Sequence, residues 1–215
     1  MISPTPDVPL GLPARLIRAC WAVVGLLTVV SVVGTATSPL LLVKAPLLLV
    51  AFAPDARHVA LSTGSVSPLL LLCVAVTRRS LYSIAVYGLG AAYGELAVCW
   101  VEARAGKLGR ALRALERLFA RVGAGLLVVM PFLSLCILAG AARTRFLLFL
   151  PTLVLGHCIW AGTTIWLGRR FADSSQAVVD FFSERLFEST LVCFALVLVY
   201  QLITRRKRTR LPPSE

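Results

Sequence analysis

The chain has few charged residues and very few acidic ones. Charged residues make up 15% of its 215 residues, whereas soluble domains carry about 25%. Asp and Glu together number 10, against 22 Lys and Arg, and hydrophobic residues reach 58%. This composition excludes a water-soluble globular protein. The formal net charge of +12 predicts contact with the anionic surface of a membrane.

The chain also lacks the motifs of the common enzyme and metal-binding classes. No G-x-S-x-G, H-E-x-x-H, P-loop or dinucleotide-binding pattern occurs. The six cysteines lie in apolar segments without a C-x-x-C pair, and there are two histidines. We therefore expect no enzyme, no cofactor and no bound metal. Nucleic acid is not an expected partner, because the basic segments carry no recognisable binding module.

Apolar blocks separated by charges dominate the sequence. They occupy residues 19–37, 39–53, 58–77, 80–101, 122–142, 146–168 and 186–204. This pattern predicts an all-α, multi-pass integral membrane protein, which we expect in the plasma membrane, with one membrane domain over 19–204. The predicted parts are a cytoplasmic tail (1–18), a first half (19–101), a basic amphipathic helix (102–121), a second half (122–204) and a basic cytoplasmic tail (205–215).

Leucines and basic residues alternate in the segment 102–121, which connects the two halves. The basic residues there are Arg104, Lys107, Arg110, Arg113, Arg117 and Arg121. The alternation predicts an amphipathic helix that lies flat on lipid headgroups. Each cation near an anionic leaflet contributes about 1 kcal/mol, so we expect these side chains to bind anionic headgroups. The positive-inside rule places this helix and the basic tail in the cytoplasm.

Two segments are better explained as broken helical hairpins than as straight spans. With both basic segments cytoplasmic, the three blocks between them must make an even number of crossings, so one block returns to the side it entered from. The block 122–142 fits best, since it carries Pro131 at its centre and Gly140 near its end. In the first half, Pro54, Asp55 and Arg57 interrupt two apolar arms and predict a second hairpin, with full crossings as the alternative. Such paired breaks are typical of inverted-repeat transporters.

Several motifs occur together in a characteristic order. The second half carries Pro131, Ala139-Gly140, Phe146, Gly156-His157-Cys158-Ile159-Trp160 and Gly168, and the first half carries Pro54-Asp55, Gly94-Glu95, Trp100 and Gly106. In this order and spacing, residues 40–171 resemble the DedA / SNARE-associated Golgi protein (VTT domain) family. The chain departs from that family's pattern at Val128 and Ser134, where arginines are usual, and at Cys99, where a tyrosine is usual.

The resemblance implies transbilayer movement of a phospholipid or a polyprenyl phosphate. It implies that Asp55, Arg57 and Glu95 line a polar path. The residues expected to shape the two breaks are Pro54, Pro131, Gly140 and Gly156. The alternative for Glu95 is a structural pairing with an arginine, and Asp55 and Arg57 either pair at a hairpin tip or lie in a wet loop.

Other polar and small residues have simpler interpretations. We expect His157 to be a buried, hydrogen-bonded histidine and His58 to lie in the polar loop. Arg78-Arg79 separate two apolar blocks, where they either anchor a helix end or bind phosphate. The Gly90 and Gly94 pair predicts close helix packing within the domain, with a homo-oligomer contact as the alternative.

Two rival functions are compatible with the same sequence. One is a small membrane scaffold whose helices pack and bind a partner without transport. The other is a membrane-embedded enzyme that modifies lipids. The scaffold predicts that Asp55 and Glu95 tolerate neutral replacement, whereas the face formed by Gly90 and Gly94 does not.

Overall fold

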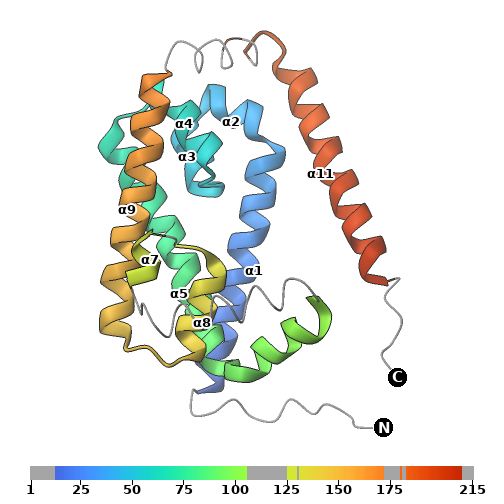
Figure 1. Cartoon of the computed structure of the whole chain (residues 1–215). Coiled ribbons are helices and arrows are strands. Elements are labelled where there is room, and N and C mark those ends of the chain that lie inside the picture. The colour runs from blue at the N-terminus through green and yellow to red at the C-terminus, as the bar shows by residue number, and fades with distance from the viewer. Residues whose placement is uncertain (1–12, 106–124, 130, 172–179, 181–182, 210–215) are drawn as a thin grey trace. The chain divides into compact units, whose positions relative to one another are not determined.

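The computed structural model describes residues 13–105, 125–129, 131–171, 180 and 183–209. Within these ranges the chain is helical and contains no strand, which confirms the all-α prediction for the described part. The elements are α1 (Ala14–Ala36), α2 (Ser38–Lys44), α3 (Pro46–Phe52), α4 (Ala56–Leu61), the 3-10 turn η1 (Ser62–Gly64), α5 (Pro68–Ala105), α7 (Gly125–Val129), α8 (Leu133–Ala141), α9 (Phe146–Arg170) and α11 (Leu186–Thr209) (Figure 1).

Three helices in the described part are long and apolar enough to cross a membrane. They are Ala14–Ala36, Pro68–Gly94 and Phe146–Arg170. Their outward surfaces carry large apolar side chains such as Leu26, Leu69 and Leu147, which are 63%, 70% and 85% exposed. Such surfaces are unfavourable in water and suit the hydrocarbon of a membrane. These helices are those expected of a membrane protein.

The chain forms two compact units that alternate along the sequence. Unit 1 comprises Met1–Leu27 and Val76–Trp160, and unit 2 comprises Thr28–Ala75 and Ala161–Glu215. The helices α1, α5 and α9 each contribute residues to both units. Each unit therefore combines segments that are far apart in the sequence.

Helix α5 corrects the predicted division between blocks 58–77 and 80–101. It begins at Pro68 and passes straight through Arg78-Arg79. The Nη2 atom of Arg78 donates a hydrogen bond of 2.7 Å to the Leu27 carbonyl, and the Arg79 guanidinium lies 3.7 Å from the centre of the Trp160 ring. Both cations thus have partners inside unit 1. These partners allow the two charges to lie within the helix and not at its end.

Gly94 is the point at which helical geometry fails within α5. Its φ of 50° and ψ of −133° lie in a region that favours glycine, because a Cβ atom would be strained there. The apolar span therefore ends at Gly94, and the helical residues up to Ala105 follow the kink.

Unit 1 has a core to which four helices contribute. Its buried residues are Val86, Leu127, Leu135, Cys136, Leu138, Ala139, Phe149 and Leu153. Contacts pair Tyr87 with Phe149 at 4.3 Å between ring centroids, Ser83 with His157, and Arg79 with Trp160. Residue numbers fall along α5 as they rise along α9, so the two helices are antiparallel in this unit.

Glycines let the short helices of unit 1 approach their neighbours at backbone distance. A Cβ atom at Gly140 would collide with the Tyr87 carbonyl oxygen, and one at Gly156 would collide with the Leu127 carbonyl oxygen. Gly90 is similarly close to the Ile137 backbone, which confirms the predicted packing role for Gly90. These contacts join α8 to α5 and α7 to α9, and Figure 1 shows the two short helices in yellow.

Unit 2 packs three short helices against the ends of longer ones. In this unit Ser31 of α1 donates a hydrogen bond of 3.1 Å to the Phe52 carbonyl at the end of α3. A Cβ atom at Gly168 of α9 would lie 2.7 Å from the Ala60 carbonyl oxygen of α4. Helix α11 contacts α2. The short helices are therefore positioned by α1, α9 and α11.

We predict that Gly140→Ala and Gly156→Ala each lower the free energy of unfolding by about 1–3 kcal/mol, because the added methyl group has no room. Gly162→Ala in α9 is the matched control, since nothing lies within 4 Å of a Cβ atom there. The control gains up to about 1 kcal/mol from helix propensity. Thermal unfolding in detergent measures all three, and equal midpoints for them would contradict the packing described.

Candidate functional site

The chain leaves helical geometry on both sides of Pro54. Helix α3 ends at Phe52 and α4 begins at Ala56. The Ala53 carbonyl freed by this break accepts the backbone N–H of Asp55 at 2.8 Å and lies 2.9 Å from Nδ1 of His58. A carbonyl oxygen can only accept, so Nδ1 carries the proton. A break whose carbonyl groups are satisfied in this way is compatible with a low-dielectric environment.

His58 corrects one expectation from the sequence. It does not lie in a polar loop but in α4, where it is 3% exposed. The reason is its bond to Ala53, which draws the ring inward and uses it to cap the end of α3.

Asp55 and Arg57 form an ion pair beside the break. Oδ2 of Asp55 and Nη2 of Arg57 lie 3.5 Å apart, and the side chains are 57% and 62% exposed. The two side chains therefore pair, and the position of this pair at a hairpin tip stays a prediction. An exposed pair of this length contributes about 0–1 kcal/mol to stability, so folding alone does not require it.

The second break surrounds Pro131. Helix α7 ends at Val129 and α8 begins at Leu133, and Pro131 itself is buried. Gly140 and Gly156 do not lie at the break. They hold its two arms, with Gly140 in α8 against α5 and Gly156 in α9 against α7.

Polar side chains of α5 and α9 gather beside this second break. Ser83 Oγ of α5 and His157 Nε2 of α9 are 3.3 Å apart, and the Ser83 side chain also hydrogen-bonds Cys136 of α8. The expectation of a buried, hydrogen-bonded His157 is confirmed at Nε2. We name Arg79, Ser80, Ser83 and His157 the polar cluster.

Two atoms of the polar cluster have no hydrogen-bond partner. These are Ser80 Oγ and His157 Nδ1, in residues that are 7% and 1% exposed. Leaving such an atom buried and unpaired costs about 1–3 kcal/mol. Ser80 and Ser83 were not predicted as site residues, although the sequence places these two serines three residues apart in an apolar helix.

The remaining predicted site residues are only partly described. Glu95 lies on α5 directly after the kink at Gly94, and its side chain is outside the described residues. The same is true of the Arg104 side chain. The other cations of the predicted amphipathic helix lie wholly outside the described residues: Lys107, Arg110, Arg113, Arg117 and Arg121.

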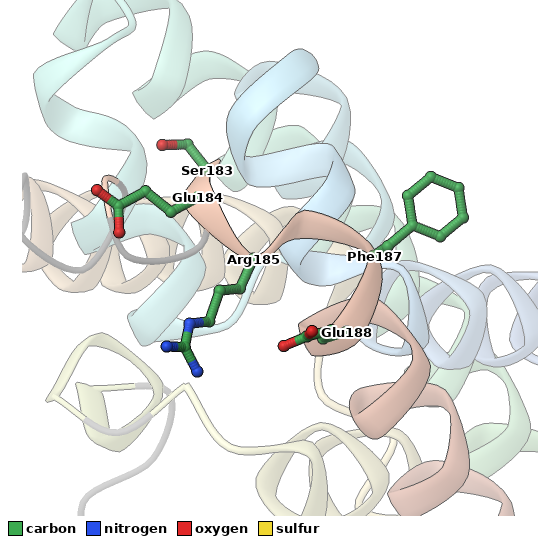
Figure 2. A pocket seen from close by; sticks show the side chains of 5 residues that line it. All are labelled: Ser183, Glu184, Arg185, Phe187 and Glu188. Atoms are coloured by element: carbon green, nitrogen blue, oxygen red, sulfur yellow. The ribbon is translucent and has the colours of Figure 1, made fainter.

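One surface depression lies at the start of α11 in unit 2. It is lined by Ser183, Glu184, Arg185, Phe187 and Glu188. Figure 2 shows the Phe187 side chain pointing away from the three charged ones, and Phe187 is 91% exposed. None of the predicted site residues lines this depression. Across the described ranges, no three His, Cys, Asp or Glu residues gather in a way that could hold a metal ion.

Comparison with known proteins gave no match, whether to a family model, a curated protein or a solved structure. The resemblance to the DedA family therefore depends on the motif residues themselves.

We predict that His58→Leu lowers the free energy of unfolding by about 1 kcal/mol, because the Ala53 carbonyl loses a donor. His58→Asn is the matched variant, since its amide nitrogen can donate from the position of Nδ1. Thermal unfolding in detergent compares the two. The expected order of stability is wild type, then Asn, then Leu, and a Leu variant as stable as the wild type would contradict a capping role.

Proposed function

We propose that this protein moves the phosphate-bearing headgroup of a lipid, a phospholipid or a polyprenyl phosphate, across the membrane. The observation that carries the proposal is the interruption of the chain at two prolines. At both Pro54 and Pro131 one helix ends and another begins, in a chain whose described part has three helices able to span a bilayer. Membrane proteins tolerate such breaks where the backbone is buried in protein or lines a water-filled cavity.

The energetic problem in lipid translocation is the charge of the headgroup. A charged side chain at the centre of a membrane helix costs about 2.5–3.5 kcal/mol on insertion scales. Polar groups along the path lower this cost while the acyl chains stay in lipid. The exposed pair of Asp55 and Arg57 beside the Pro54 break supplies one charge of each sign.

Each polar residue has a role in this proposal. Arg57 binds the lipid phosphate, and Asp55 holds the Arg57 guanidinium in place when no lipid is bound. Glu95 follows the Gly94 kink in the sequence, and the resemblance assigns it to the same polar path. Because the Asp55–Arg57 contact is exposed and adds little to stability, a ligand can exchange for either partner at little cost to the fold.

The proposal includes a topology. Both interrupted segments are re-entrant hairpins, related as an inverted repeat within a multi-pass protein of the plasma membrane. The basic helix at 102–121 lies on anionic headgroups at the cytoplasmic face. We propose a transporter and not an enzyme, with no cofactor.

We predict that purified protein in liposomes moves fluorescent phospholipid between leaflets faster than protein-free vesicles do. Arg57→Gln and Asp55→Asn should each slow this movement roughly tenfold, the equivalent of one lost hydrogen bond to a charged group. Both variants should keep the wild-type unfolding midpoint, because the pair is exposed. Dithionite quenching of the outer leaflet measures the rate.

Lys44→Gln is the control, since Lys44 is an exposed cation of the same unit and lies outside the break. Its rate should equal the wild-type rate. Wild-type vesicles no faster than empty ones would overturn the proposal. If cells also tolerated replacement of Asp55 and Arg57 but did not tolerate Gly90→Leu, a scaffold without transport activity would be the better explanation.

A further inference from the structure

The polar cluster of unit 1 lies near the middle of two candidate membrane spans. Ser83 is well inside the span Pro68–Gly94, and His157 is well inside Phe146–Arg170. Membrane helices seldom place polar groups at this depth unless the groups serve a ligand or a transport path. The cluster is therefore a candidate site separate from the Asp55–Arg57 pair.

The composition of the polar cluster favours an anion. Arg79 brings a permanent positive charge, which acts on the neighbouring His157 ring. Ser80 follows Arg79 and lies one turn before Ser83, so a hydroxyl and an imidazole accompany the cation. A guanidinium, a hydroxyl and an imidazole N–H are all donors, and together they match the oxygen atoms of a phosphate group.

Two atoms of the cluster lack the partners that a purely structural role would provide. Ser80 Oγ and His157 Nδ1 are buried without a hydrogen bond. In contrast, Ser83 Oγ is occupied by His157 Nε2 and by Cys136. The groups left over are those beside Arg79. A ligand that accepts from a hydroxyl and from an imidazole would satisfy both.

The second break provides a way for a ligand to reach the cluster. Helix α7 contacts α9 at Gly156, next to His157, and Cys136 of α8 contacts Ser83. The two arms are the short helices α7 and α8, of five and nine residues, which lie on either side of Pro131. Movement of either arm would uncover the residue that it contacts, Gly156 beside His157 for α7 and Ser83 for α8, without unfolding α5 or α9.

We propose that Arg79, Ser80 and His157 form a binding site for a phosphate group, exposed when the arms of the Pro131 break move apart. The inference deepens the proposed lipid movement, on which it rests for its assignment to a lipid headgroup. The same chemistry would also accept free phosphate. The ligand accepts a hydrogen bond from Ser80 and one from His157, and the Arg79 charge balances its own.

The test measures binding of dodecyl phosphate, a single-chain phosphate monoester, to the full-length protein in dodecyl maltoside. Inorganic phosphate is the second ligand. Ser80→Ala removes the unpartnered hydroxyl, and His157→Gln removes Nδ1 while keeping a polar atom near Ser83. Each variant should bind dodecyl phosphate about tenfold more weakly or worse than the wild type.

The unfolding midpoint of a variant distinguishes a ligand-binding role from a structural role. Ser80→Ala removes only an unpaired buried polar atom, so its unfolding midpoint should stay unchanged or rise and its weaker binding cannot come from a damaged fold. Thr163→Val is the matched control, because it removes an exposed hydroxyl from the same helix. This control should bind dodecyl phosphate as the wild type does.

The outcomes distinguish this site from the proposed function. Wild-type affinity in both variants, or no binding by the wild type, overturns the site even if the protein moves lipid. Binding that depends on Ser80 and His157 supports the site even if liposomes show no lipid movement. Preference for dodecyl phosphate over inorganic phosphate identifies a lipid source, and equal affinity identifies free phosphate as the ligand of the same site.

Discussion

A chain that leaves helical geometry in an apolar environment must satisfy the carbonyl groups that it frees. This constraint explains the arrangement around Pro54, where the Ala53 carbonyl accepts from the Asp55 N–H and from Nδ1 of His58. It also explains why His58 is buried in α4. In water these hydrogen bonds would add little, since solvent could replace them. They matter most if the break is removed from bulk water, as a re-entrant segment would be.

The two breaks differ in how exposed their polar groups are. Near Pro54 the charged side chains Asp55 and Arg57 remain exposed, so this region can meet a ligand without rearrangement. Beside the Pro131 break, Ser80 and Ser83 of α5 and His157 of α9 are buried, and glycines bring the helix backbones into direct contact. One region is open and polar, whereas the other is closed and carries unpaired polar atoms. A transport cycle needs both a site that captures charge and a site that opens.

Local features of the sequence predicted the parts of the fold that depend on local chemistry. Proline positions predicted the interruptions, and the long apolar blocks predicted apolar helices, of which the described part has three that are able to span a membrane. The continuation of α5 through Arg78-Arg79 was not predicted, because it depends on the Leu27 carbonyl and on Trp160, both distant in sequence. The polar cluster was missed for the same reason, since Ser83 and His157 are 74 residues apart. The lipid path, the re-entrant topology and the inverted repeat stay predictions.

The central claim is that the chain turns back inside the membrane at Pro54 and at Pro131. Single cysteines at Ser38 and Ser65 flank the first interrupted segment, and single cysteines at Arg121 and Ala142 flank the second. In a background without the six native cysteines, a membrane-impermeant maleimide reports the side on which each position lies. The account predicts that the two members of each pair label from the same side of the membrane. Labelling from opposite sides in either pair would show a full crossing there and contradict it.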